Sequence, residues 1–120
     1  MTQLPNQRIY DLEERTYRFA ASVRSFLRKL PKTISIIEDG KQLLRSSGSV
    51  GANYIEANES LSKKDFLMRI KICRKEAKES AYWLKLIEVD GLMKNDKGFL
   101  QNEAVELTKI FGAIVEKTKI

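Results

Sequence analysis

Histidine is absent from the sequence, and cysteine occurs once, at Cys73. Without histidine, the chain cannot build a Ser-His-Asp or Cys-His catalytic arrangement, a histidine-bearing zinc site or the Glu-x-x-His pairs of di-iron bundles. A single cysteine can form neither an intrachain disulfide nor a thiolate metal site. The glycine-rich signatures of phosphate-binding loops are also missing. We therefore expect a protein that is not an enzyme, with no catalytic residues, no metal and no cofactor.

Proline is limited to Pro5 and Pro31, so the sequence permits long helices. No apolar run approaches the roughly 20 residues that span a bilayer. The first residues also lack the apolar core of a signal peptide. With 42% hydrophobic and 32% charged residues, the composition is typical of a soluble helical protein. We expect a cytoplasmic protein with no membrane partner.

Apolar residues recur at alternating steps of four and three in four segments, which is the pattern of amphipathic helices. The predicted helices cover residues 10–30, 34–58, 63–90 and 97–118, and short connections join them. This organisation predicts one all-α domain over residues 1–120, an up-down-up-down four-helix bundle. The expected inward residues are Leu12, Thr16, Phe19, Val23, Phe26 and Leu30; Ile36, Gly40, Leu43, Ser47, Val50, Tyr54, Ala57 and Leu61; Phe66, Ile70, Cys73, Ala77, Ser80, Leu84 and Ile87; and Leu100, Glu103 or Ala104, Leu107, Ile110 and Ile114, with Phe99, Phe111 and Val115 beside them.

Local signals mark where these helices begin and end. Thr33 or Ser35 is a candidate N-cap for the second helix, and Ser60 or Ser62 for the third, where Asp65 follows Ser62 at capping-box spacing. Gly91 is the expected C-cap of the third helix. Residues 95–98 contain Asn, Asp and Gly and are expected to form a polar turn before the fourth helix.

The second predicted helix carries small residues where helix cores usually have large ones. Gly40, Gly48 and Gly51 each destabilise a helix by roughly 0.8–1 kcal/mol relative to alanine. Close approach of a neighbouring helix would compensate for this cost. The alternative interpretation is a loop that separates two shorter helices.

The formal net charge of +6 is unevenly distributed along the chain. Residues 1–32 carry a net charge of +4 and residues 62–85 a net charge of +5, whereas residues 33–61 and 86–120 carry −2 and −1. The excess lies within two predicted helices, which indicates a basic surface rather than a basic tail.

The third helix concentrates this charge on an outward face. The candidate nucleic-acid-binding residues there are Lys64, Lys71, Lys75, Lys78 and Lys85, and the first helix could extend the surface with Arg15, Arg24 and Arg28. One interpretation is an ordinary solvated exterior, which every bundle needs. The other is a phosphate-binding surface with little sequence preference. For Tyr54, Tyr82 and Trp83, packing is favoured over stacking on bases.

A second apolar strip flanks the core residues of the third helix. Ile72, Tyr82, Trp83 and Leu86 make up this strip and are the candidate oligomer interface. A wide bundle core that covers all four residues is the alternative. We prefer an interface, because an apolar strip outside the core must be covered.

Polar groups on the predicted core faces have structural interpretations. For Asn53 and Glu56 we favour an interhelical hydrogen-bond network over a ligand site. Glu76 and Glu79 are expected to form salt bridges rather than bind a metal. Cys73 is expected to be a buried structural thiol, since no histidine can activate it.

Several short motifs resemble those of a bacterial family of four-helix bundle proteins, the S23 or 23S rRNA intervening-sequence proteins. That family carries Ser-(Ile/Val)-x-Ala-Asn-x-x-Glu in its second helix and opens the next with Ser-Lys-x-(Asp/Glu)-Phe. The matching residues here are Ser49, Val50, Ala52, Asn53 and Glu56, then Ser62, Lys63, Asp65 and Phe66. Residues 75–87 are similar to one branch of the family. The chain departs from the family at Gly51, where many members have proline, and at Ala57, where they have glycine.

The resemblance implies a homo-oligomer, with a pentameric ring as the expected form. A distantly related bundle works beside a reverse transcriptase in diversity-generating retroelements, so a reverse transcriptase is a further expected partner. The sequence-based hypothesis is a non-enzymatic homo-oligomeric protein whose basic surface contacts the backbone of RNA or DNA, as a ribonucleoprotein accessory factor. The alternative is a structural or protein-binding adaptor with no nucleic-acid role.

Overall fold

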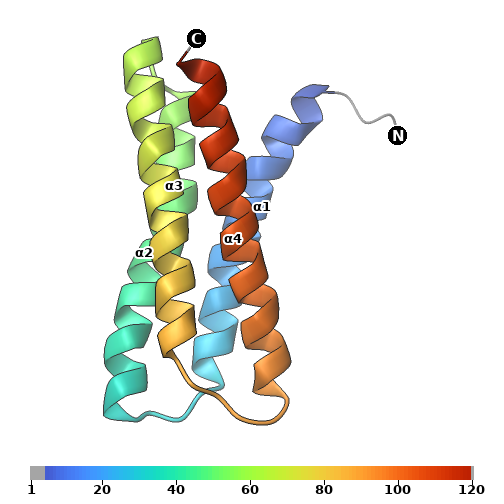
Figure 1. The fold of residues 1–120 in the computed structure, drawn as a ribbon, viewed down its shortest axis with the longest axis vertical. Helices are drawn as coiled ribbons and strands as arrows, with labels where there is room; N and C mark the ends of the chain where they lie inside the picture. The colour runs from blue at the N-terminus through green and yellow to red at the C-terminus, as the bar shows by residue number, and fades with distance from the viewer. Residues whose placement is uncertain (1–4, 120) are drawn as a thin grey trace.

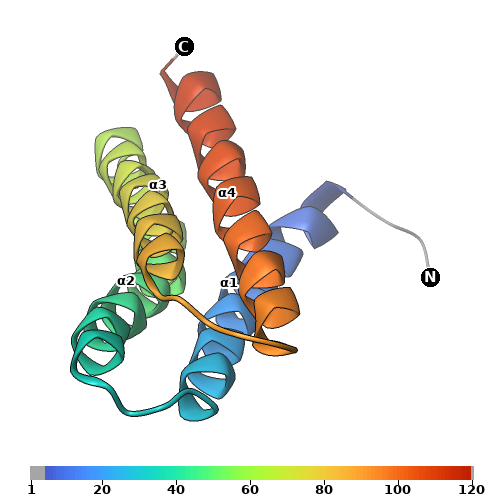
Figure 2. The ribbon, with the colours of Figure 1, turned by 60° about the horizontal axis from the view of Figure 1, so that its bottom comes forward.

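The computed structural model describes residues 5–119, with side chains described for residues 12–119. Its helices are α1 (Pro5–Arg28), α2 (Ile34–Asn58), α3 (Lys63–Leu86) and α4 (Met93–Thr118). They alternate in direction and pack in the cyclic order α1–α2–α3–α4, so that α1 and α3 lie diagonally opposite (Figures 1 and 2). The predicted all-α four-helix bundle is confirmed.

The predicted caps of α2 and α3 are present. The Thr33 hydroxyl accepts a hydrogen bond from the backbone N–H of Ile36 at 3.3 Å. The Ser62 hydroxyl accepts one from the N–H of Asp65 at 3.1 Å. Each bond satisfies a backbone donor that the first turn of a helix leaves free. The helix α1 ends at Arg28, shortly before Pro31.

The boundaries of α1, α3 and α4 differ from the predicted ones. Pro5 starts α1 five residues earlier than predicted, as its fixed φ suits a first helical position. Ile87 caps α3, and Gly91 lies in the following turn at φ +57° rather than at the C-cap. Residues 95–98 belong to the first turns of α4, because α4 already begins at Met93, after i→i−3 turn bonds such as the one from the Lys94 N–H to the Gly91 carbonyl.

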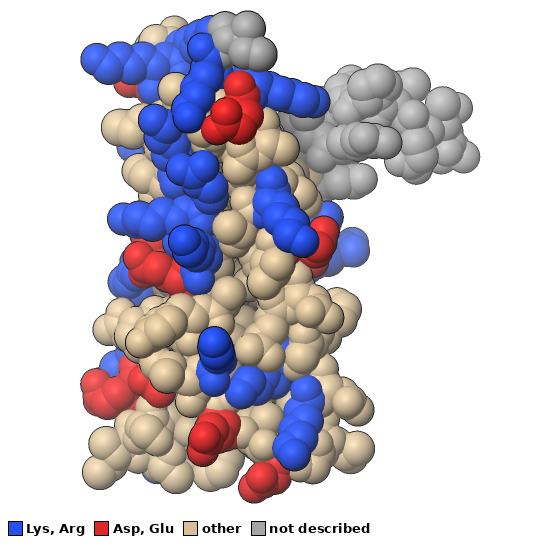
Figure 3. All heavy atoms as spheres, in the orientation of Figure 1, with Lys and Arg blue, Asp and Glu red and all other residues tan. Residues whose placement is uncertain are grey.

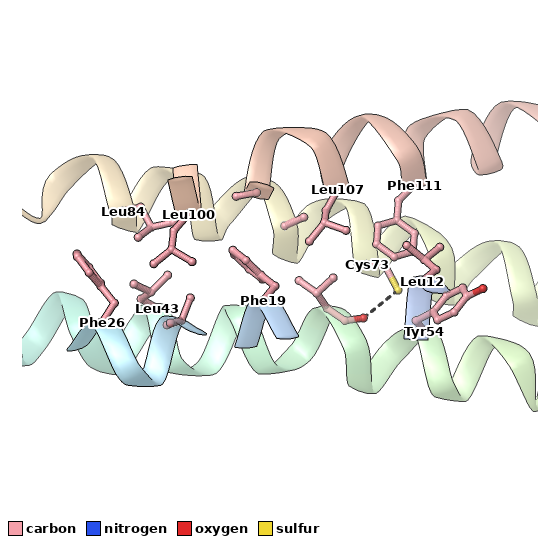
Figure 4. Close-up of a cluster of buried hydrophobic side chains, with 14 of the residues drawn as sticks. Leu12, Phe19, Phe26, Leu43, Tyr54, Cys73, Leu84, Leu100, Leu107 and Phe111 are labelled. Atoms are coloured by element: carbon pink, nitrogen blue, oxygen red, sulfur yellow. Dashed lines mark hydrogen bonds between the residues drawn. The ribbon is translucent and has the colours of Figure 1, made fainter. Parts of the chain in front are cut away.

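Residues from all four helices meet in one buried core (Figure 4). The predicted inward residues of α1 are all buried, and so are those of α3 except the partly buried Phe66. In α4 the prediction was wrong by one residue: Phe111 and Val115 are fully buried, while Ile110 and Ile114 lie at the edge of the core. Both pairs follow Leu107 at near-helical spacing, so the local pattern alone does not separate them.

Two further residues predicted to be buried are exposed. Leu61 follows the end of α2 at Asn58, and 99% of its surface is accessible. Phe99 lies on the side of α4 next to α1, outside the core, and is 70% exposed. Both residues fit the apolar pattern, but exposed apolar residues also occur singly on protein surfaces.

The small residues of α2 permit close helix packing, and α2 is one continuous helix rather than two. A Cβ atom on Gly51 would lie 2.9 Å from the Thr16 hydroxyl of α1 and 3.3 Å from the Thr16 Cβ. On the α3 side, the hydroxyls of Ser46 and Ser80 are 2.8 Å apart and both side chains are buried. We expected close packing to compensate for the low helix propensity of glycine, and the structure shows this close packing between α1 and α2 at Gly51.

The substitution Gly51→Ala tests this packing. We expect it to lower the free energy of unfolding by roughly 1–2 kcal/mol, because overpacking against the buried Thr16 outweighs the gain in helix propensity. The matched control is Gly98→Ala in α4, where a Cβ would meet nothing within 4 Å. The control should raise the free energy of unfolding by about 0.5–1 kcal/mol. Urea denaturation measures both changes, and equal stabilisation by the two substitutions would contradict a close approach at Gly51.

Candidate nucleic-acid interface

The outward face of α3 carries a continuous row of exposed side chains opposite the core. These residues follow one another at steps of four and three, so they share one face of the helix. We call this row the lysine stripe; its members are Lys64, Met68, Lys71, Lys75, Lys78, Tyr82 and Lys85. Basic side chains gather over α3, most densely toward its N-terminal end (Figure 3).

A groove beside the lysine stripe runs between α3 and α4. It has a volume of about 730 Å³. Five cationic side chains line it together with two apolar residues and one hydroxyl: Lys71, Arg74, Lys75, Lys78 and Lys109, with Ala81, Val105 and Thr108. No sequence signal points to Lys109 or Thr108, because their position beside the groove depends on how α4 aligns with α3. A concave, strongly cationic surface of this kind suits a polyanion.

The carboxylates Glu76 and Glu79 of α3 pair mainly with α2 and leave most of these lysines unpaired. The Arg45 guanidinium of α2 donates to Glu76 at 3.2 Å and to Glu79 at 2.9 Å. The Glu76 side chain is only 7% exposed, and Lys75 reaches it from 4.0 Å. Both glutamates thus form salt bridges, as predicted, but Arg45 of α2 is their principal partner rather than the adjacent lysines of α3.

Most of the lysine stripe consequently has uncompensated charge. Lys64, Lys71, Lys78 and Lys85 form no salt bridge with any side chain in residues 12–119. All four are exposed. A polyanion could therefore pair with these ammonium groups without first breaking an internal ion pair.

The predicted extension of this surface onto α1 is wrong, because α1 lies diagonally opposite α3. Arg15 instead forms a two-pronged ion pair with Glu103 of α4, at 2.7 and 2.9 Å, and this hydrogen bonding raises the pKa of Arg15. Arg24 donates to the carbonyl of Ala20 and lies over Gly48 of α2. Arg28 is exposed at the end of α1.

Asn53 connects α2 to α3. Its side-chain amide donates to the carbonyl of Ser49 and accepts a hydrogen bond from Arg69, both at 2.9 Å. The interhelical link that we expected at Asn53 and Glu56 is therefore made by Asn53 through Arg69. Glu56 and Ala52 are exposed on α2.

The predicted oligomer interface does not form one surface. Trp83 is partly buried against the core, and its indole N–H is buried with no hydrogen-bond partner among the described residues. Tyr82 is 56% exposed and lies within the lysine stripe. Ile72 and Leu86 lie on the side of α3 that also carries Glu79, the partner of Arg45 on α2. Only these two remain as an outward apolar pair.

Cys73 is buried, and its thiol donates to the carbonyl of Val50 at 3.3 Å (Figure 4). Burial raises the pKa of this thiol to about 12, so the thiol stays protonated at neutral pH, in keeping with a structural role. Within residues 12–119, no cluster of three Cys, Asp or Glu side chains could hold a metal ion. None of the described helices is long and apolar enough to cross a bilayer.

Comparison with known proteins gives one family. The family model described as "23S rRNA-intervening sequence protein" matches residues 3–113. A crystal structure of a protein of unknown function from the S23 ribosomal protein family of Bacteroides thetaiotaomicron is 27% identical. The similarity covers 90% of this chain and 97% of that one, with a TM-score of 0.76. No protein with a curated description matches. The chain belongs to the 23S rRNA-intervening sequence protein family.

Proposed function

We propose that the α3–α4 groove and the lysine stripe bind the phosphate backbone of nucleic acid. The observation that carries this proposal is a set of four exposed ammonium groups in the stripe that have no carboxylate partner in residues 12–119: Lys64, Lys71, Lys78 and Lys85. The carboxylates that could have neutralised them, Glu76 and Glu79, are held by Arg45 on the other side of α3. The family's description refers to an intervening sequence in 23S rRNA, so RNA is the first nucleic acid to test.

The mechanism is electrostatic docking. Each phosphate that pairs with a cation releases condensed counterions, so affinity falls as salt concentration rises. Contacts from all five groove cations would give log K against log salt a slope of about −3.5 for single strands and about −4.5 for duplex DNA. These slopes are upper limits, because Lys75 and Lys109 already pair with Glu76 and Glu106, at 4.0 and 3.8 Å. Phosphate contacts fix position but carry no sequence information, so we expect little sequence preference.

Reversing the groove charges tests the proposal. The triple variant Lys71→Glu, Lys75→Glu and Lys78→Glu lowers the formal net charge from +6 to zero. We expect at least a 100-fold loss of affinity for RNA at about 100 mM salt, because three attractive contacts become repulsive. Fluorescence anisotropy with a labelled oligoribonucleotide measures binding, and circular dichroism checks that helicity is unchanged.

A control variant distinguishes the effect of where the charge is changed from the effect of the change in net charge. Arg18→Glu, Arg28→Glu and Lys32→Glu change the net charge equally but act at α1 and the turn after it, away from the α3–α4 groove. This control should lose much less affinity than the groove variant. Equal losses in the two variants would show that the groove is not the site. A parent protein with no affinity and no salt dependence would favour the protein-binding adaptor instead.

Self-association is a second candidate property, and the 44% exposed Leu86 with the half-buried Ile72 supports it. We propose that this outward apolar pair meets another copy of the chain. Multi-angle light scattering should then give a mass several times 13.8 kDa, with five subunits as the expected number. Replacing both residues with glutamate should yield a single subunit, since it would place charge in an apolar contact. A parent protein that stays monomeric at high concentration would contradict this proposal.

A further inference from the structure

Tyr82 is one of the two members of the lysine stripe that carry no charge, and it is the aromatic one. It follows Lys78 by four residues and precedes Lys85 by three, so side chains on both sides of it along this face are cationic. The helical rise places Tyr82 about 6 Å beyond Lys78 and about 4.5 Å before Lys85 along the axis. With 56% of its surface exposed, its ring is accessible from solvent.

The phenol ring of Tyr82 is supported from one side. Its centroid lies 5.1 Å from that of Trp83, with an interplanar angle of 74°, an edge-to-face arrangement. Trp83 is itself packed against the core. This contact restrains the tyrosine ring. A ligand that stacks on the ring therefore causes little further loss of side-chain conformational entropy.

Other aromatic side chains are poorly placed to serve the lysine surface. Tyr54 is 3% exposed and packs against Phe111 in the core. Phe99 is exposed but lines hollows between α1 and α4. Tyr17 is exposed on α1, the helix diagonal to α3. Among the described aromatic residues, Tyr82 is therefore the one that combines exposure with cationic neighbours on α3.

We infer that the lysine stripe binds a single-stranded segment of nucleic acid, with one unpaired base stacked on Tyr82. The inference rests on the proposed phosphate-binding function and adds the class of ligand. Surfaces that bind single strands combine a cationic track for the backbone with aromatic rings for the bases. In a duplex the bases are stacked on one another inside the helix, so a duplex could use the lysines but not the tyrosine.

Matched substitutions at Tyr82 test this inference. We expect Tyr82→Leu to weaken binding of a ten-nucleotide oligouridylate by about 10- to 100-fold, in line with the loss of one stacked base. Binding of an RNA duplex of the same length should stay within about threefold of the parent, since its contacts are to phosphates. Tyr82→Phe keeps the ring and should restore single-strand affinity to near the parent value.

The chain's single tryptophan provides an independent readout at the same place. Oligouridylate that stacks on Tyr82 should change the emission of Trp83, whose ring contacts the tyrosine. An abasic oligonucleotide of equal length supplies the same phosphates without bases, and it should bind with much less change in emission.

The outcomes separate this inference from the proposed function. If Tyr82→Leu binds oligouridylate as tightly as the parent, or if the abasic strand alters the emission equally, the base-stacking inference is overturned and phosphate binding stands. If Tyr82→Leu changes the mass measured by light scattering, Tyr82 lies in a subunit contact and the inference is likewise overturned. If the parent binds neither single strands nor duplexes, the proposed function itself fails.

Discussion

Close packing of α2 against both of its neighbours is the constraint on which the arrangement of this bundle depends. On one side, the α2 backbone at Gly51 lies so close to Thr16 of α1 that a Cβ atom would not fit between them. On the other side, Ser46 and Ser80 meet in a buried hydrogen bond between α2 and α3. Larger side chains at these positions would push the helices apart or force neighbouring side chains into other rotamers. The small residues therefore set the distance between α2 and α3. This distance determines which polar side chains can connect the two helices.

That proximity decides the electrostatics of α3. Arg45 reaches across from α2 to bind both Glu76 and Glu79, and Arg69 reaches back to Asn53. These links direct the carboxylates and one arginine of α3 toward α2. The face turned away from the core is left with lysines, and Lys109 of α4 adds a further cation across the groove. A bundle whose net charge is only +6 thus presents a concentrated cationic surface.

The fold was largely predictable from the sequence, because helix periodicity and caps such as Ser62 are local signals. The lysine row of α3 was predictable for the same reason. Relations between helices were not: the place of Lys109 depends on packing, and the diagonal position of α1 removes Arg15 from the α3 surface. The shift to Phe111 in the core of α4 also depends on packing, since two apolar registers compete there. The exposure of Tyr82 was not predictable either, because the pattern groups it with its apolar neighbour Trp83, which does pack against the core.

Backbone amide mapping by NMR tests the central claim most directly, because it locates a binding surface without any substitution. The measurement is a titration of the ¹⁵N-labelled protein with a single-stranded oligoribonucleotide. The account predicts that the largest amide shifts fall on α3 between Lys71 and Lys85 and around Lys109 of α4. Residues of α1 and the outer side of α2 should move little. Shifts centred on α1 or α2, or no shifts at saturating oligonucleotide, would contradict the account.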